Sequence, residues 1–176
     1  MKKIITLAGS NSKESINKKL ANYAAKQIEN IEIVSLDLNN FELPLYGVDL
    51  ENESGIPNEA HRLFNSVQSA DGLIISLAEH NGSYSTAFKN ALDWMSRIDG
   101  KLWGQKPMLL MATSPGGRGG QTVLDAALGS FPHMGGNIVA DFSLPSFYDN
   151  FSESGLKDDA LNTSLAEKIS LLEKAI

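Results

Sequence analysis

Apolar stretches alternate with stretches of helical spacing along the whole chain. Five predominantly apolar runs predict strands, and they cover residues 3–9, 31–38, 72–78, 107–112 and 137–144. Most of these runs are nearly continuous and do not alternate with polar residues, as is typical of strands that are covered on both faces. The pattern therefore favours a parallel sheet inside the protein.

Apolar residues recur at helical spacing in the segments between and after these strands. The spacing predicts five helices, around residues 16–24, 57–67, 85–98, 123–128 and 161–172. Ser15 and Ser85 are suited to cap two of them, and Pro57 suits the first turn of another. We expect the polar stretch 150–159 to form a loop before the last helix.

Strands and helices that alternate in this order form βα units with right-handed crossovers. We expect an α/β fold in a single domain over residues 1–176: a three-layer sandwich with a five-stranded parallel sheet and helices on both faces. Such sheets bind ligands in the crevice beyond the carboxyl ends of their strands. The candidate site therefore consists of the loops after the first, third and fourth strands.

The loop after the first strand, residues 9–17, is rich in hydroxyl and amide side chains and leads into a helix. Serine hydroxyls and the N–H groups of a helix N-terminus favour an anion such as phosphate. The patterns G-x-x-x-x-G-K-[ST] and G-x-G-x-x-G are both absent, which argues against a triphosphate loop and a Rossmann dinucleotide site. For this loop alone, an ordinary turn that caps a helix is an equally good interpretation.

The other two loops have the composition expected around a flat ligand. In residues 78–85, Gly82 permits close backbone approach or a positive φ, and His80 is either a proton donor, a flat contact surface or a solvated side chain. Residues 113–120 contain four glycines within five positions, so their backbone can lie against a ring, although a flexible hinge is the alternative. Seven of the 15 glycines fall between Gly116 and Gly136.

Composition narrows the class of protein further. The absence of cysteine excludes disulfides, thiolate nucleophiles and thiolate metal sites. A net charge of -6 without a basic cluster argues against nucleic acid as a partner. No run is long enough to cross a membrane and no signal peptide is evident, so we expect a cytoplasmic protein. Neither a catalytic triad motif nor histidines at metal-ligand spacing occur, so we expect no metal.

The three loops together resemble the NADPH-dependent FMN reductase family, whose members have a flavodoxin-like fold and include bacterial quinone, chromate and azo-dye reductases. The first loop is similar to the family block G-S-x-R-x-x-S-x-N at Gly9, Ser10, Ser15 and Asn17. The second is similar to P-E-Y-N-x-S-x-P-x-x-L-K-N-A-I-D-W at Glu79, Asn81, Ser83, Lys89, Asn90, Ala91, Asp93 and Trp94. The third is similar to S-x-G-x-x-G-G at Ser114, Gly116, Gly119 and Gly120. The resemblance covers roughly residues 3–145.

The chain departs from these blocks at several positions. Ser12 stands where the family usually has an arginine that helps to hold the FMN phosphate, and His80 replaces the usual tyrosine. Ala78 stands in place of the first proline of the second block, and Leu92 in place of its isoleucine. We expect these departures to affect FMN affinity and substrate preference but not the fold.

The resemblance implies a sheet of order 2-1-3-4-5 and an enzyme that passes hydride from NADPH or NADH through bound FMN to a small acceptor, such as a quinone or free flavin, in a ping-pong scheme. It implies FMN phosphate contacts at Ser10, Ser12, Ser15, Ile16 and Asn17. It implies ring contacts at Ala78, Glu79, His80, Asn81 and Ser83 on one side and at Ser114, Gly116 and Gly117 on the other. His80 is the candidate catalytic residue. Asp93 and Trp94 are expected to serve packing or subunit contacts.

Two further expectations follow from the resemblance. It implies a homodimer or homotetramer with flavin near the subunit boundary. A non-enzymatic electron carrier or flavin-binding sensor on the same fold is the alternative function.

Overall fold

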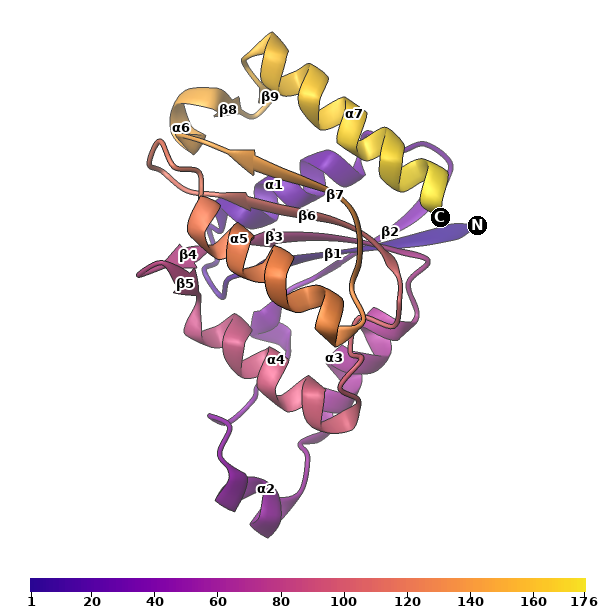
Figure 1. Ribbon diagram of the computed structural model, residues 1–176, viewed down its shortest axis with the longest axis vertical. Helices are drawn as coiled ribbons and strands as arrows, with labels where there is room; N and C mark the ends of the chain where they lie inside the picture. Colours follow the sequence, from indigo (N-terminus) through magenta and orange to yellow (C-terminus); the bar gives the residue numbers. More distant parts are fainter.

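The computed structural model describes residues 1–176, and its centre is a five-stranded parallel sheet (Figure 1). The strands of this sheet are β1 (Lys2–Gly9), β2 (Ile31–Leu36), β3 (Gly72–Leu77), β6 (Pro107–Thr113) and β7 (Asn137–Leu144). They lie in the order β2-β1-β3-β6-β7, and all four pairings are parallel. Because β6 and β7 are the fourth and fifth long strands of the chain, the expected order 2-1-3-4-5 is confirmed.

Helices cover both faces of this sheet, as Figure 1 shows. One face carries α1 (Ile16–Ala25) and α7 (Asp159–Ala175), and the other carries α3 (Asn58–Gln68), α4 (Thr86–Ile98) and α5 (Gln121–Ser130). Neighbouring strand residues face opposite layers: Ile4 and Ile74 pack toward α1 and α7, whereas Ile5 and Ile75 pack toward the other three helices. This two-sided burial explains the continuous apolar runs. None of the helices has the length and apolar character needed to cross a membrane.

The two predicted serine caps are present, and both hold helices that begin at the carboxyl edge of the sheet. The Ser15 hydroxyl accepts the Lys18 N–H at 3.2 Å, and the Ser85 hydroxyl accepts the Phe88 N–H at 3.2 Å. Ser85 also donates to the Gly9 carbonyl at 2.8 Å, which ties the start of α4 to the end of β1. These contacts fix the loops after β1 and β3 relative to each other.

Several predicted boundaries differ from the structure by one to three residues, and two of these differences have a clear local cause. The second strand ends at Leu36 rather than at residue 38, because the Asp37 carboxylate accepts the Asn39 N–H at 2.9 Å and starts a 3₁₀ turn, η1 (Leu38–Asn40). Pro57 keeps an extended backbone and immediately precedes α3, so it does not lie within the first turn.

Several short elements were not predicted from the sequence. They are α2 (Val48–Ser54), β4 (Glu79–His80), β5 (Ser83–Tyr84), η2 (Phe131–Met134), α6 (Phe147–Asn150), β8 (Phe151–Ser152) and β9 (Gly155–Leu156). The loop expected over residues 150–159 does precede the last helix, but most of it forms a hairpin of β8 and β9. Its turn depends on Gly155, which has a φ of +111° and lies against the Tyr23 ring where a Cβ would not fit. Figure 1 shows that α2 projects from the sandwich within an extended excursion of the chain, residues 41–57, between η1 and α3.

Candidate functional site

A cavity of about 210 Å³ lies beyond the carboxyl ends of β1, β3 and β6. Its lining residues come from the three predicted loops and from α6; they are Ser10, Ser12, Glu14, Ser15, Ile16, Asn17, Ala78, Glu79, His80, Thr113, Ser114, Pro115 and Tyr148. Cavities that enclose a whole drug-sized ligand are usually about 300–1,000 Å³. This cavity can therefore enclose part of such a ligand, and the remainder would lie across the exposed loops beside it.

Donor groups converge at the end of the cavity formed by the loop after β1. Ser10 and Ser15 are buried, and each hydroxyl oxygen already accepts a backbone N–H, from Ser12 and Lys18 respectively. A hydroxyl that accepts in this way keeps its proton free to donate. The first N–H groups of α1 have no partner within the helix, and the helix dipole adds positive potential there. The arrangement favours an anion.

No lysine or arginine side chain lines this cavity. Its charged or titratable groups are Glu14, Glu79, His80 and Tyr148. Glu14 is 87% exposed and its carboxylate lies 3.4 Å from the Lys19 ammonium, a pair so open to solvent that it contributes little to stability. The positive potential of the anion end therefore comes from backbone dipoles rather than from a cationic side chain.

Asn17 has a role that its motif does not reveal. Asn17 is buried, with only 2% of its surface exposed. Its Oδ1 accepts both the Thr113 N–H at 3.0 Å and the Ser76 hydroxyl at 2.7 Å. Its Nδ2 donates to the Thr113 carbonyl at 3.1 Å. The side chain thus braces α1 against β3 and β6. The backbone N–H of Asn17, in the first turn of α1, is the group that remains available to an anion.

The loop after β3 is a hairpin of β4 and β5. Asn81 and Gly82 occupy its turn with φ values of +52° and +73°, as a two-residue type I′ turn requires. The Asn-Gly pair is the signal by which the sequence could have revealed this hairpin. His80 lies at the edge of the cavity and is exposed, whereas Asn81 and Ser83 lie outside it.

The glycines of the loop after β6 divide into two groups. Gly116 and Gly117 are exposed, and no atom lies closer than 3.9 Å to where their Cβ atoms would be. Gly119 and Gly120 are buried with positive φ, and a Cβ on Gly119 would lie 2.9 Å from the Leu144 carbonyl oxygen. Gly116 and Gly117 therefore offer backbone to a ligand beyond the edge of the cavity, while the other two allow the turn into α5.

The structure brings most of the predicted residues together and adds four. Asn81, Ser83, Gly116 and Gly117 do not line the cavity, and Glu14, Thr113, Pro115 and Tyr148 line it without having been predicted. Tyr148 belongs to α6 and is 67% exposed. An aromatic residue just after the fifth strand, at the ligand-binding edge of the sheet, is the signal that could have identified it.

The fold and this site define a flavodoxin-like α/β protein with an anion-binding helix end beside an open surface for a flat ring. Residues 2–149 match the family model described as NADPH-dependent FMN reductase. The chain belongs to this family. It is therefore an oxidoreductase that uses FMN, with NAD(P)H as the electron donor.

Individual relatives support the same assignment. The chain is 30% identical over 150 residues to the quinone reductase of Escherichia coli K12, covering 77% of this chain and 78% of the relative. It is 32% identical over 176 residues to a 2-hydroxy-1,4-benzoquinone reductase of a Burkholderia species, covering 85% and 94%. The solved structure of FerB from Paracoccus denitrificans, a flavoenzyme NAD(P)H:(acceptor) oxidoreductase, is similar with a TM-score of 0.76 and 26% identity, covering 99% of each chain.

Proposed function

We propose that this chain reduces a small acceptor, a quinone or a free flavin, with electrons that NAD(P)H delivers through FMN in a ping-pong scheme. The observation that carries the proposal is a single cavity that joins the anion-binding end of α1 to the hairpin after β3 and the glycine loop after β6. The names of relatives that reduce quinones support the acceptor class. Because NAD(P)H is supplied inside the cell, the proposal also places the reaction in the cytoplasm.

The donors of the cavity fit the phosphate of FMN. In our proposal, the hydroxyl groups of Ser10, Ser12 and Ser15 hold it together with the N–H groups of Ile16 and Asn17. The Ser12 side chain is exposed and makes no hydrogen bond of its own within the protein, so it is free to turn toward the ligand.

The proposed ring contacts come from both sides of the opening. On one side we place Ala78, Glu79, His80, Asn81 and Ser83, mostly through their backbone, and on the other side Ser114, Gly116 and Gly117. The N–H groups of Gly116 and Gly117 donate to no acceptor within the protein, so they are available to a ring oxygen or nitrogen. Preorganised donors of this kind stabilise negative charge that develops on a ligand during reduction.

Bound FMN supplies the two-electron chemistry, which no side chain of this chain can perform. The protein contributes binding and orientation, and His80 offers a titratable ring at the cavity edge. We propose that His80 donates a proton to the acceptor or selects among acceptors.

His80→Phe tests that role. We expect a lower rate of acceptor reduction and a changed pH profile, because the variant has the size of a flat ring without the titratable nitrogen. Steady-state rates from about pH 5 to 9 are the measurement. The matched control is His133→Phe, at an exposed position in η2 outside the cavity. Unchanged turnover and pH profile in His80→Phe would eliminate the role.

The experiment for the whole proposal is a steady-state assay with NAD(P)H and a water-soluble quinone. A ping-pong scheme predicts parallel lines when reciprocal rates are plotted against reciprocal quinone concentration at several NAD(P)H concentrations. The absence of FMN-dependent NAD(P)H oxidation with any quinone or flavin acceptor would contradict the proposal.

We also propose that the protein acts as a homodimer or homotetramer. The excursion that leads into α2 exposes two apolar side chains, Leu45 at 75% and Val48 at 59%. Leu45 lines a hollow together with Ser83 and Tyr84, so this apolar surface adjoins the hairpin after β3. A second copy that covers Leu45 and Val48 would lie close to the site.

A further inference from the structure

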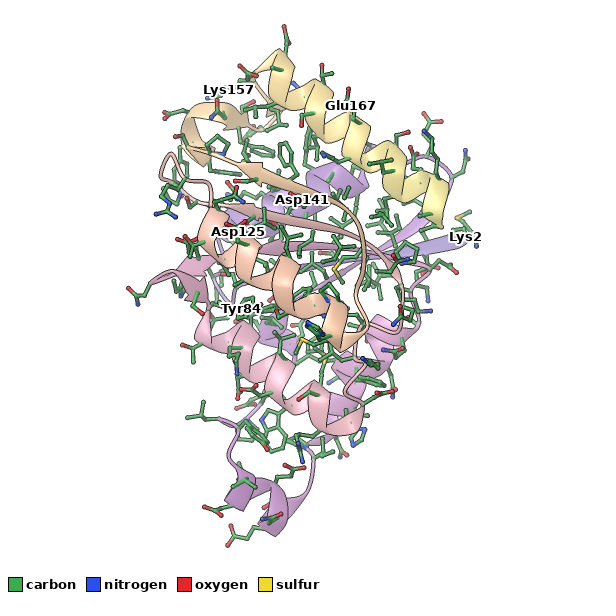
Figure 2. The ribbon with its side chains drawn as sticks, viewed as in Figure 1. Lys2, Tyr84, Asp125, Asp141, Lys157 and Glu167 are labelled. Carbon is green, nitrogen blue, oxygen red and sulfur yellow. The ribbon has the colours of Figure 1, made fainter.

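The hairpin of β4 and β5 is attached to α5 at both ends of that helix. The Glu79 carboxylate accepts the Val123 N–H at 3.0 Å, in the first turn of α5. At the other end, the Tyr84 hydroxyl lies 3.0 Å from the Ser130 hydroxyl. Tyr84, labelled in Figure 2, also packs against Phe88 of α4 with ring centroids 5.6 Å apart. The hairpin therefore rests on α5 rather than standing free in solvent.

The N-terminus of α5 has no cap of its own. The residue before the helix is Gly120, which is in the left-handed region and has no side chain to accept an N–H. The first N–H groups of a helix need acceptors, and a carboxylate is the most favourable acceptor at the positive end of the helix dipole. Glu79, 44 residues earlier in the chain, supplies that acceptor to Val123.

The same contact joins the two walls of the proposed ring site. The hairpin carries His80 and Asn81, and α5 continues directly from the glycine loop after β6. That loop is itself anchored, because the Ser146 N–H donates to the Gly116 carbonyl at 2.9 Å and the Phe147 N–H donates to the Ser114 carbonyl at 3.0 Å. Glu79 is thus the link that ties the first strand of the hairpin to α5, which follows a loop that is fixed on its other side.

We propose that Glu79 is a positioning residue that sets the separation of the hairpin and the glycine loop for a flat ring between them. The inference rests on the proposed function, since it gives the site a ring to hold. Glu79 lines a cavity that has no cationic side chain, but its carboxylate accepts an N–H of α5, so the helix compensates its negative charge. Small losses of alignment in a preorganised site weaken binding and catalysis strongly.

Three variants of Glu79 separate this role from general stability. Glu79→Ala removes the acceptor, Glu79→Asp keeps the charge but shortens its reach to Val123, and Glu79→Gln keeps an acceptor of the same length. The matched control is Asp158→Ala, because Asp158 caps α7 through the Leu161 N–H at 2.8 Å and lies outside the cavity. It removes a carboxylate cap of the same kind without touching the site.

Two readouts are needed: the Kd of FMN from quenching of its fluorescence, and hydrogen exchange at the Val123 amide in the ligand-free protein. We expect Glu79→Ala and Glu79→Asp to raise the Kd of FMN by about tenfold, because the two walls of the ring site are no longer held at their preorganised separation. Both variants should lose protection at Val123. Glu79→Gln should stay within about threefold of the wild-type Kd and keep protection, because its amide oxygen still accepts the N–H.

Asp158→Ala should lower the thermal stability but leave the Kd of FMN unchanged. If Glu79→Ala does not fold, Glu79→Asp gives the same test. A wild-type Kd in the Ala and Asp variants, or an equal rise in Asp158→Ala, would overturn the positioning role while leaving the proposed function intact. If the wild-type protein bound no FMN at all, the proposed function would fail first and this inference with it.

Discussion

Glu14 places a carboxylate at the rim of a cavity whose other groups favour an anion. It stands two residues after Ser12, where the family usually has an arginine. The loop therefore lacks that positive charge and carries a negative charge as well. Lys19 compensates the charge of Glu14 only weakly, because this ion pair is exposed to solvent. In the proposed site, the phosphate of FMN would therefore bind against one unfavourable charge.

Glu14→Gln should tighten FMN binding. We expect the Kd to fall by about two- to fivefold at low salt and by less at high salt, because charges at this exposure interact through water. Fluorescence titration with FMN is the measurement. Glu167→Gln is the control, since Glu167 is exposed on α7 (Figure 2) and does not line the cavity. An unchanged Kd would show that the Glu14 carboxylate does not reach the phosphate end of the site.

Single residues also show where sequence analysis reaches its limit. Ser15 was predicted as a cap from its place before a helix, and local spacing is sufficient for that. The brace formed by Asn17 was not predictable in the same way, because its partner Thr113 is 96 residues away. A motif identifies which residue is present, but the fold decides which of its atoms remain free.

At the scale of elements, the glycine loop after β6 offers a matched pair of substitutions. Gly119→Ala should lower the free energy of unfolding by about 2–3 kcal/mol, because a positive φ is unfavourable for alanine and its Cβ would meet the backbone of Leu144. Gly116→Ala should leave stability within about 0.5 kcal/mol, because the space around it is open. Urea unfolding measures both values. Equal stability of the two variants would mean that the loop does not need its left-handed turn.

The excursion that carries α2 is held by a small polar network. Arg97 Nε donates to the Glu51 carboxylate at 2.9 Å, and the Tyr46 hydroxyl donates to it at 2.9 Å. The Arg97 guanidinium, followed by the Tyr46 hydroxyl, holds the pKa of Glu51 below its ordinary value of 4.5. Trp94 of the family block supports the same segment, because its Nε1 donates to the Pro44 carbonyl at 2.7 Å. This buried tryptophan is a packing residue, as expected.

The depressed pKa of Glu51 fixes the sign of a pH effect. A carboxyl group whose pKa is lower in the folded protein contributes stability above its unfolded pKa and loses it as pH falls through the folded pKa. Glu51→Gln should therefore be less stable than the wild type at pH 6 to 7, and the difference should shrink as the pH falls below 4.5 and vanish once it is below the folded-state pKa of Glu51. Urea unfolding across this range is the measurement. Glu53→Gln, on the same helix, should show no such difference, and a pH-independent gap for Glu51→Gln would contradict the account.

The long elements were predictable because the spacing of their apolar residues follows which positions are buried. β3 is buried at all six positions and is an apolar run interrupted only by Ser76, and α4 places Phe88, Leu92 and Met95 on its buried face. The hairpins of β4–β5 and β8–β9 have strands of two residues each, too short for any periodicity. Turn chemistry, such as Asn81-Gly82, is the only local signal that such elements carry.

At the scale of the whole molecule, the exposed apolar residues near α2 bear on assembly. Leu45→Asp should shift the protein toward a smaller assembly, because a charge in the centre of an apolar contact is costly to bury. Light scattering coupled to size-exclusion chromatography measures the mass. Leu171→Asp, at a 44% exposed position on α7, is the control. A wild-type monomer, or an assembly that Leu45→Asp does not change, would contradict the proposed contact.

The order of the sheet and the position of the site follow from general rules of α/β proteins and from the three family blocks. Parallel strands bring their carboxyl ends to one edge, so loops that are about 35 residues or more apart in the chain meet in one cavity. Tyr148 lines the cavity although it lies outside the three family blocks. The proposed contact surface for a second copy, at Leu45 and Val48, lies in a segment that carries no motif. These parts depend on tertiary placement, which spacing along the chain does not encode.

The most direct test of the account is the spectrum of the purified protein supplied with FMN. The account predicts that FMN binds, that the protein shows flavin absorbance, and that this absorbance bleaches when NADPH or NADH is added without oxygen and returns when a quinone is added. A colourless protein that FMN cannot reconstitute, or a bound flavin that neither nucleotide bleaches, would contradict it.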